Sequence, residues 1–408
     1  MEKKIIELFA GVGGFRIGFE KANPNWETVF ASQWEPGKKN QFAFNCYKEH
    51  FEDKGGVTKF SNCDISTVPT SEMPDCTVLV GGFPCQDYSV ASTGAKGIQG
   101  KKGVLWWEIE RILEDKQPAF ILLENVDRLL KSPSKQRGRD FGVILACLNR
   151  LGYGVEWRVI NAAEYGFVQR RKRIFIFAFK NTTKYFSEIE KKDISRIVYF
   201  DGIFAKRFHV KRDKDLNKIN ETEIVISNDI QDVSDNFKYN FENTGIMING
   251  KVYTAKTEHG TPVQEQVVLG DILEENVSSK YYINQDDMPK WEYMKGPKAI
   301  PRKSKDGHEY MFREGGIAFP DPLDKPARTM LTSEASKNRS THIIQDPTTG
   351  RLRKLTPLEC ERINGFPDNW TNTGLTDSNR YFCMGNALVV NVVKELADEI
   401  GYIVDSEN

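Results

Sequence analysis

The segment Gly81-Gly82-Phe83-Pro84-Cys85-Gln86 places a cysteine where it could act as a nucleophile. Residues 76–81 form a short apolar run typical of a buried strand. Cys85 is therefore expected just past a strand's carboxyl end, where sites form in open α/β sheets, and its thiolate would be the reactive form. Residues 89–103 are rich in glycine, serine and lysine, which suits a lid over an anionic polymer. The alternative is a surface loop beside a buried cysteine.

An acidic segment and a basic segment could complete such a site. Glu124-Asn125-Val126 ends the next predicted strand, and its carboxylate lies beside Cys85 if the two strands are neighbours. Residues 169–173, Gln-Arg-Arg-Lys-Arg, precede another strand, where alternation sends Arg171 and Arg173 to one face. Taken alone, the acid could instead cap a loop, and the basic run could be solvated surface.

A glycine turn, Phe9-Ala10-Gly11-Val12-Gly13-Gly14, follows a predicted strand and opens a predicted helix. Glycines at such a place let a ligand approach the backbone at the positive end of a helix. The spacing departs from GxGxxG, and the absence of a phosphate-binding lysine disfavours a P-loop. On this motif alone, a structural turn, a dinucleotide site and an adenosyl site stay open.

The elements that would position these residues alternate between strand and helix over residues 1–185. Apolar runs predict strands at 4–9, 76–81, 119–123, 157–160 and 173–179, and helical spacing predicts helices at 15–21, 105–113 and 141–151. Buried strands that alternate with amphipathic helices imply an α/β fold with a mostly parallel sheet and helices on both faces.

The second half of the chain is organised differently. Residues 186–325 are polar and irregular and predict a smaller mixed, strand-leaning domain. A hinge segment is expected at 326–382, followed by a C-terminal segment at 383–408 with an amphipathic helix. That helix suits the first domain, so the chain is expected to leave it and return.

Composition narrows the class of protein. A chain of 408 residues exceeds the usual size of a single core. The seven cysteines form no CxxC pair, so we expect neither a metal site nor a disulfide framework. No apolar run is long enough to span a bilayer and no secretory signal is present, which favours a cytosolic protein. The net charge of zero argues mildly against a nucleic-acid partner, but residues 128–139 and 290–305 are locally basic.

In their order along the chain, these segments resemble the motifs of the cytosine-C5 DNA methyltransferase family. The resemblance covers residues 1–180 and 320–400. It rests on the glycine turn at 9–14, Asp64-Ile65, Pro84-Cys85-Gln86, Glu124-Asn125-Val126, Gln169-x-Arg171-x-Arg173, Leu355-Thr356-Pro357 through Gly365-Phe366-Pro367, and Gly385-Asn386-Ala387.

The resemblance implies a Rossmann-like, S-adenosylmethionine-dependent methyltransferase that flips a cytosine out of double-stranded DNA. Cys85 would attack C6, Glu124 would hold a proton at N3, and Arg171 would bind O2. Arg173 would brace Glu124 or the loop, and residues 186–325 would read neighbouring bases. A monomer in a bacterial restriction-modification system is implied, located in the cytoplasm at the nucleoid, with a cognate restriction endonuclease as a functional partner.

The resemblance also assigns site residues. The catalytic set is Cys85, Glu124, Arg171, Arg173, Pro84 and Asn125. The cofactor set, which would bind S-adenosylmethionine and its product S-adenosylhomocysteine, is Phe9, Ala10, Gly11, Gly13, Gly14, Gln33, Trp34, Asp64, Ile65, Leu105 and Asn386. The expected DNA contacts are Gln86, Ser89, Lys101, Arg128, Lys131 and Arg137. Gln33 stands where the family usually has the glutamate that binds the ribose hydroxyls, so Gln33 and Glu35 are both open as the ribose ligand.

Three other functions compete with this interpretation. A tRNA cytosine methyltransferase would share the catalytic motifs but is expected to have a smaller insert than residues 186–325. A nicotinamide or flavin oxidoreductase would use the glycine turn but would not need Cys85, Glu124 and Arg171 together. A non-catalytic DNA-binding protein would gain nothing from that set.

Overall fold

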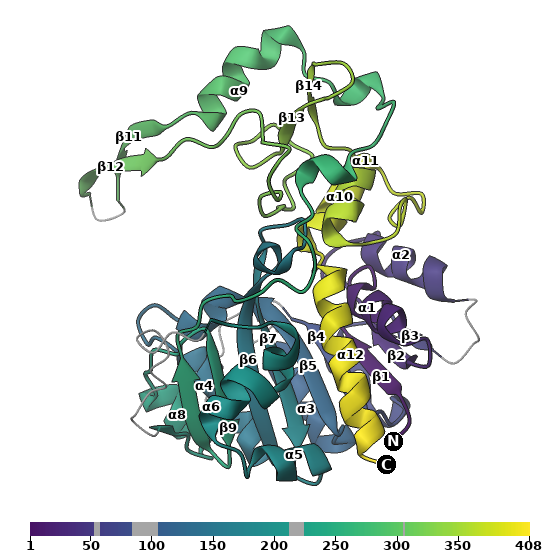
Figure 1. The fold of residues 1–408 in the computed structure, drawn as a ribbon, viewed down its shortest axis with the longest axis vertical. Helices are drawn as coiled ribbons and strands as arrows, with labels where there is room; N and C mark the ends of the chain where they lie inside the picture. Colours follow the sequence, from purple (N-terminus) through teal and green to yellow (C-terminus); the bar gives the residue numbers. More distant parts are fainter. Residues whose placement is uncertain (53–57, 84–104, 212–223, 305–306) are drawn as a thin grey trace. The chain divides into compact units, whose positions relative to one another are not determined.

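The computed structural model describes residues 1–52, 58–83, 105–211, 224–304 and 307–408. Within them, a ten-stranded sheet has the order β3-β2-β1-β4-β5-β7-β6-β9-β10-β8 (Figure 1). The first five strands in this order, β3-β2-β1-β4-β5, pair in parallel. The pairings from β5 to β8 are antiparallel. The predicted α/β class is confirmed, and the sheet is mixed. Its strands are β1 (Lys4–Leu8), β2 (Glu27–Ser32), β3 (Lys59–Ser61), β4 (Val78–Gly82), β5 (Phe120–Val126), β6 (Tyr153–Asn161), β7 (Lys172–Lys180), β8 (Ile224–Val225), β9 (Thr244–Ile248) and β10 (Lys251–Ala255).

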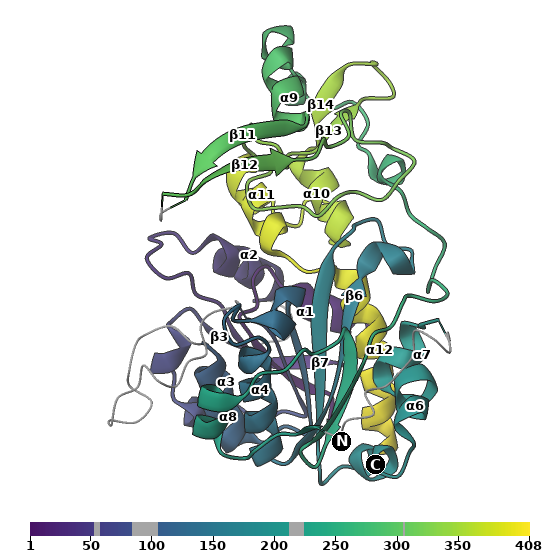
Figure 2. The same cartoon turned by 90° about the vertical axis from the view of Figure 1, so that its left-hand side faces the viewer.

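The parallel half of the sheet is buried on both faces. The runs at 78–80 and 120–123 are fully inaccessible to solvent, as expected when helices cover both sides. Figure 2 shows α3, α4 and α8 on one side of the sheet and α6, α7 and α12 on the other. The helices of this unit are α1 (Gly14–Ala22), α2 (Phe42–Phe51), α3 (Leu105–Lys116), α4 (Arg139–Arg150), α5 (Lys184–Ile189), α6 (Ile194–Arg196), α7 (Ile203–Arg207), α8 (Ile230–Asn236) and α12 (Val390–Ser406).

The unit that contains this sheet comprises Met1–Gly166, Lys172–Glu265 and Val390–Asn408. It therefore extends well beyond the domain boundary expected at residue 185. The reason is a hairpin, β9–β10, whose first strand pairs with β6, so that residues up to Glu265 belong with the large sheet. At Val390 the chain returns to this unit, where a Cβ added to Gly18 in α1 would lie only 2.5 Å from a Val393 methyl in α12.

The second unit comprises Phe167–Arg171 and Gln266–Val389. Its helix α10 begins with a capping box formed by Thr356 and Glu359 and ends at Gly365 in the left-handed conformation. Buried ion pairs of Arg353 with Glu359 (2.8 Å) and Asp346 (2.7 Å) join α10 to the strand before it. Its elements are α9 (Met288–Lys295), β11 (Lys298–Lys303), β12 (Glu309–Glu314), β13 (Ile343–Gln345), β14 (Leu352–Lys354), α10 (Pro357–Asn364) and α11 (Asp377–Asn386).

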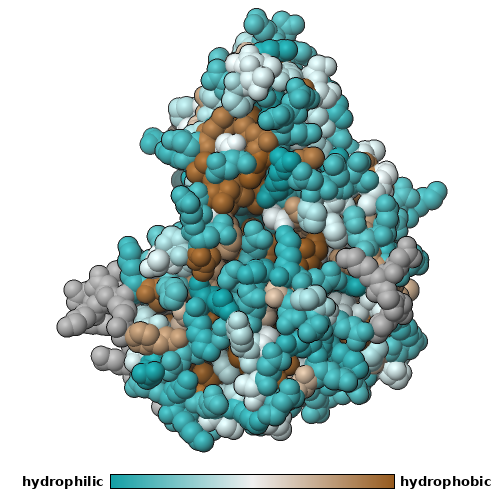
Figure 3. Space-filling view, turned by 45° about the vertical axis from the view of Figure 1, so that its right-hand side comes forward, coloured by the Kyte–Doolittle hydropathy of each residue, from teal (hydrophilic) through white to brown (hydrophobic). Residues whose placement is uncertain are grey.

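On the face drawn in Figure 3, hydrophilic residues predominate and hydrophobic residues gather in a few patches. Among the described helices, none has the length and apolar character needed to cross a bilayer.

A buried carboxylate, Glu7, lies in β1 just before the glycine turn and accepts a hydrogen bond of 2.7 Å from the Tyr47 hydroxyl. Burial raises the pKa of Glu7 to about 7, against the opposing effects of Tyr47 and Arg16. The folded state therefore holds this proton more tightly than the unfolded chain, and its stability falls as pH rises from about 4.5 to 7.

We expect Glu7→Gln to remove this pH dependence. As pH rises from 4.5 to 8, the unfolding free energy of the variant should increase relative to that of the wild type by on the order of 2–3 kcal/mol. Urea unfolding of both proteins across that range measures the difference. Parallel pH profiles would show that Glu7 is not the titrating group.

Candidate functional site

Within the first unit, several predicted site segments follow strands that end at one edge of the large sheet. Because β1, β2, β4 and β5 are parallel, their carboxyl ends lie at the same edge. The chain runs outward from β1 to β2 and β3 on one side, and from β4 to β5 on the other, so the order reverses between β1 and β4. Ligands of open α/β sheets bind at such a reversal.

The glycine turn follows β1 at this edge. Phe9, Gly11 and Gly13 have positive φ angles of 55°, 57° and 92°, and α1 begins at Gly14, after Ala10 donates its N–H to the Ser32 carbonyl at 2.9 Å. A Cβ on Gly13 would lie 2.7 Å from the Phe51 ring, whereas a Cβ on Gly11 would meet no described atom within 4 Å. Gly13 is thus required by packing, while the backbone at Gly11 is open to a ligand.

Gln33 contacts the glycine turn directly, because its Oε1 accepts the Gly11 N–H at 2.8 Å. Trp34 beside it keeps 38% of its surface exposed. Glu35 lies in a separate turn, where its N–H donates to Gln41 Oε1 at 2.7 Å. Of the two candidate ribose ligands, only Gln33 is joined to the glycine turn by a hydrogen bond in the described residues.

Asp64 and Ile65 lie just beyond β3. Asp64 caps a short 3-10 helix, where its Oδ1 accepts from the N–H and hydroxyl of Ser66 at 3.1 and 2.8 Å. Ile65 is buried. Asp64 is therefore held in a fixed orientation near the same edge of the sheet, while Leu105 stands at the first residue of α3.

Glu124 and Arg173 form an ion pair of 2.8 Å between Oε1 and Nε. Glu124 lies near the end of β5, and Arg173 lies near the start of the antiparallel neighbour β7. Gly82 is the register partner of Glu124 in β4, and a Cβ there would lie 3.3 Å from Glu124 Oε2. The predicted contact between Arg173 and Glu124 is present, and the carboxylate lies next to the strand that leads to Cys85.

Asn125 holds the backbone at Phe83, the last described residue before the predicted Pro84-Cys85-Gln86 motif. Its Nδ2 donates to the Phe83 carbonyl at 2.8 Å, and its Oδ1 accepts the Val126 N–H at 2.8 Å. The side chain is buried, so both bonds form away from water. Five predicted residues of the following segment lie outside the described residues: Pro84, Cys85, Gln86, Ser89 and Lys101.

Arg171 and Asn386 belong to the second unit, where they are in contact. Arg171 is buried, and its Nη2 donates to the carbonyls of Gly385 (3.3 Å) and Asn386 (3.4 Å). Its Nη1 donates to the Met330 carbonyl at 3.3 Å. The Gln-x-Arg segment and the last motif are therefore joined directly.

Among the expected DNA contacts, Arg128, Lys131 and Arg137 are exposed and follow the carboxyl end of β5. In the same basic run, Arg139 is buried and paired with Asp140 at 2.8 Å. The run at 290–305 likewise includes a buried residue, Lys295, whose ammonium donates to the Thr341 carbonyl. These two residues are structural, which the charge pattern alone could not show.

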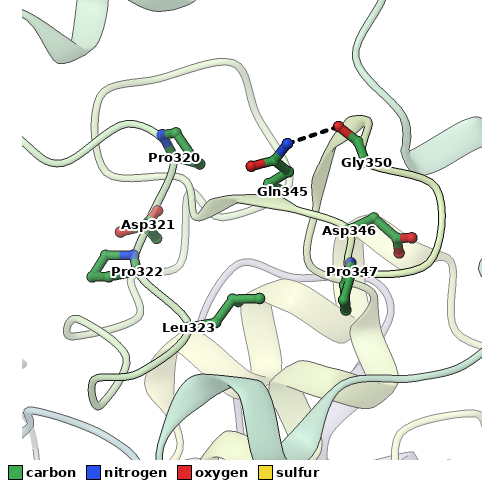
Figure 4. Close-up of a pocket in the computed structure, with 8 residues that line it drawn as sticks. All are labelled: Pro320, Asp321, Pro322, Leu323, Gln345, Asp346, Pro347 and Gly350. Carbon is green, nitrogen blue, oxygen red and sulfur yellow. Dashed lines mark hydrogen bonds between the residues drawn. The ribbon is translucent and has the colours of Figure 1, made fainter.

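A cavity of about 360 Å³ in the second unit does not resemble a site (Figure 4). Its two carboxylates are already neutralised, Asp321 by Arg328 at 2.6 Å and Asp346 by Arg353 at 2.7 Å. The Gln345 amide nitrogen donates a hydrogen bond of 3.1 Å to the Gly350 carbonyl. Among the described residues, no cluster of histidine, cysteine, aspartate or glutamate side chains could hold a metal ion.

Comparison with known proteins identifies relatives along almost the whole chain. The family model described as "C-5 cytosine-specific DNA methylase" matches residues 3–402. The Type II methyltransferase M.Sau3AI of Staphylococcus aureus is 52% identical over 97% of this chain and 95% of its own length. The Type II methyltransferase M.NlaX of Neisseria lactamica is 28% identical over 97% and 96%.

Two solved structures share the fold. The Entamoeba histolytica methyltransferase EhMeth superimposes with a TM-score of 0.59 at 17% identity, covering 100% of this chain and 99% of its own. A DNMT2 variant of Spodoptera frugiperda superimposes with a TM-score of 0.61 at 15% identity, covering 98% and 99%.

Proposed function

The chain belongs to the C-5 cytosine-specific DNA methylase family and is a DNA cytosine-C5 methyltransferase of the Type II restriction-modification class, and we propose that Cys85 is its nucleophile. The arrangement at the ends of β4 and β5 carries the proposal. Glu124 is braced by Arg173 and lies against Gly82, while Asn125 holds the Phe83 carbonyl. A carboxylate is thus fixed next to the strand end from which Cys85 follows.

The reaction needs a nucleophile because C5 of cytosine is itself a weak one. Addition of the Cys85 thiolate to C6 makes C5 electron-rich, so that C5 can accept a methyl group. Glu124 holds a proton at N3 and offsets the charge that develops in the ring. Arg171 binds O2. A base then removes the C5 proton, and the thiolate leaves C6 with restoration of the double bond.

We assign the methyl donor as S-adenosylmethionine, which supplies an electrophilic methyl group when bound. The residues fit such a molecule, since Gly11 leaves open space above the backbone and Trp34 presents an exposed ring for an adenine. Asp64 has an oxygen left for an exocyclic amine after its Oδ1 contacts Ser66. Phe9, Ala10, Gly13, Gly14, Ile65, Leu105 and Asn386 complete the proposed set.

Gln33 is the ribose ligand in this proposal, in preference to Glu35. A backbone N–H can only donate, so the Gln33 oxygen faces Gly11 and the amide nitrogen is left to donate to a ribose hydroxyl oxygen. We expect Gln33→Ala to weaken binding of S-adenosylhomocysteine about tenfold, the equivalent of one or two hydrogen bonds. Isothermal titration calorimetry measures this change without any turnover.

Two matched variants accompany that measurement. Glu35→Ala should bind within twofold of the wild type. Gln33→Glu should retain binding, because one carboxylate oxygen keeps the Gly11 N–H and the other accepts from the ribose hydroxyls. A larger loss in Glu35→Ala than in Gln33→Ala would reverse the assignment.

The substrate is double-stranded DNA in this proposal. The reacting face of cytosine is inaccessible inside a duplex, so the base must be flipped out. Arg128, Lys131 and Arg137 are exposed beyond β5 and suit phosphate contacts. We assign base reading to the part of the predicted recognition region that lies in the second unit, residues 266–325, and the hinge to residues 326–382.

The remaining proposals concern the setting. We propose a monomer in the bacterial cytoplasm, at the nucleoid, with a cognate restriction endonuclease as a functional partner. The similarity to Type II methyltransferases supports the cytoplasmic setting and the endonuclease partner. Gel filtration and light scattering with and without a DNA duplex test the oligomeric state.

The deciding experiment combines labelled S-adenosylmethionine with unmethylated bacterial DNA and, separately, with a tRNA pool. Label in DNA, located by bisulfite sequencing at one short motif, is the expected result. Label in tRNA alone would move the substrate to RNA. Absence of label from both, with S-adenosylhomocysteine binding intact, would leave a DNA-binding protein without catalysis.

A further inference from the structure

The β11–β12 hairpin is the most exposed regular element of the second unit. Its two strands form a sheet of their own and pack mainly against each other, as Figure 1 shows. Tyr310 and Met311 in β12 expose 43% and 49% of their surfaces. A two-stranded hairpin is marginally stable alone in water, so one that presents aromatic and apolar side chains is suited to a partner.

The base of this hairpin is firmly held. Arg339 donates to the Gly296 carbonyl at 3.1 Å before β11 and to the Gly315 carbonyl after β12. It also approaches Glu314 at 3.9 Å, and the Ile317 N–H donates to the Lys295 carbonyl at 2.8 Å. The two ends are thus joined, and the exposed part of the hairpin projects from a fixed base.

One face of the hairpin presents an oriented arginine. The register pairs Ile300 with Phe312 and Arg302 with Tyr310, so these four side chains share a face. The Arg302 guanidinium lies 3.7 Å from the centre of the Phe312 ring. Within the described part of the chain, the guanidinium has no carboxylate partner. Stacking therefore restricts its orientation while its N–H donors stay available.

We infer that β11–β12 enters the major groove of DNA and that Arg302 reads a guanine of the recognition site. This inference rests on the proposed function. The major groove of B-DNA admits a two-stranded ribbon, and two N–H donors of an arginine guanidinium can bond to the O6 and N7 acceptors of one guanine. Every recognition site contains at least one guanine, because a guanine pairs with the target cytosine. Lys298, Lys303 and Arg313 add positive charge for the flanking phosphates.

A double-mutant cycle between protein and DNA tests the inference. Bisulfite sequencing of wild-type product first defines the motif, and synthetic duplexes then carry 7-deazaguanine, which lacks the N7 acceptor, at one guanine each. At one position we expect the substitution to lower wild-type kcat/KM about tenfold or more, and to lower that of Arg302→Ala less than twofold. Arg313→Ala, on the opposite face, should keep the wild-type sensitivity at every guanine.

Arg302→Lys separates base reading from charge. Lysine retains the positive charge but lacks the paired N–H donors of the guanidinium. The loss of kcat/KM caused by 7-deazaguanine should therefore be as small in Arg302→Lys as in Arg302→Ala. Equal sensitivity of wild type, Arg302→Ala and Arg302→Lys at every guanine would overturn the inference. Recovery of full wild-type behaviour in Arg302→Lys would also overturn it and indicate a phosphate contact. Failure of the proposed function is distinct, because the wild type itself would then label no DNA.

Discussion

Replacing Cys85 with alanine should lower methyl transfer to DNA by roughly 10⁴-fold or more, as loss of a covalent nucleophile does in other enzymes. Without addition at C6, the ring carbon that receives the methyl group stays a weak nucleophile. The variant should still bind S-adenosylhomocysteine, because the proposed cofactor residues lie in other segments of the chain. Transfer of labelled methyl groups under single-turnover conditions measures the loss.

Cys76 provides the matched control for that experiment. It precedes β4, and burial raises the pKa of its thiol to about 12, so it supplies no thiolate at neutral pH. Cys76→Ala should retain activity within a few-fold. If Cys85→Ala kept more than a hundredth of wild-type activity, the assignment of the nucleophile would have to be abandoned.

Replacing Glu124 with glutamine should lower kcat by about 10²- to 10⁴-fold, the range of a lost acid–base group. Its effect on the KM for DNA should be small, because Glu124 acts on the flipped ring and not on the duplex backbone. The structure adds a second expectation. Arg173 holds Glu124 at 2.8 Å, so Arg173→Ala should lower kcat with little change in KM, and Arg173→Lys should restore part of the loss.

An exposed carboxylate serves as the control for Glu124. Glu72 pairs with Lys59 at 2.9 Å on the surface, and Glu72→Gln should leave kcat and KM unchanged. Steady-state kinetics on a duplex with one site provides both constants. A rise in KM without loss of kcat in Glu124→Gln would indicate a role in DNA binding instead of catalysis.

The parallel half of the fold could be predicted from the sequence for a physical reason. Strands buried on both faces must be apolar throughout, and the runs at 78–80 and 120–123 are. The residues that follow such strands lie at one edge of the sheet, so the sequence alone predicts that Glu124 and the glycine turn lie at that edge. Strand order, by contrast, was not predicted, because apolar runs do not show which strands are neighbours.

The antiparallel half was missed because its signals are shorter. The β9–β10 hairpin is joined by Asn249-Gly250, both with positive φ. An Asn-Gly pair is a strong hairpin signal, but it stands within the polar, irregular stretch 186–325 that the sequence predicts as a separate domain. Ion pairs between buried residues also could not be predicted from the sequence. Arg139 reads as one more cation in a basic run until its contact with Asp140 is known.

The packing of α12 against α1 has a consequence for how the protein is made. The surface of α1 around Gly18 is covered by Val393, which follows Gly18 by 375 residues in the sequence. At about 5–20 residues per second, synthesis of Val393 follows that of Gly18 by roughly 20–75 s. During that time the amino-terminal strands have been synthesised but the helix that covers them has not. The unit that carries the glycine turn therefore completes its fold only after α12 has been synthesised, and a nascent chain remains incomplete however much of the preceding sequence has already emerged.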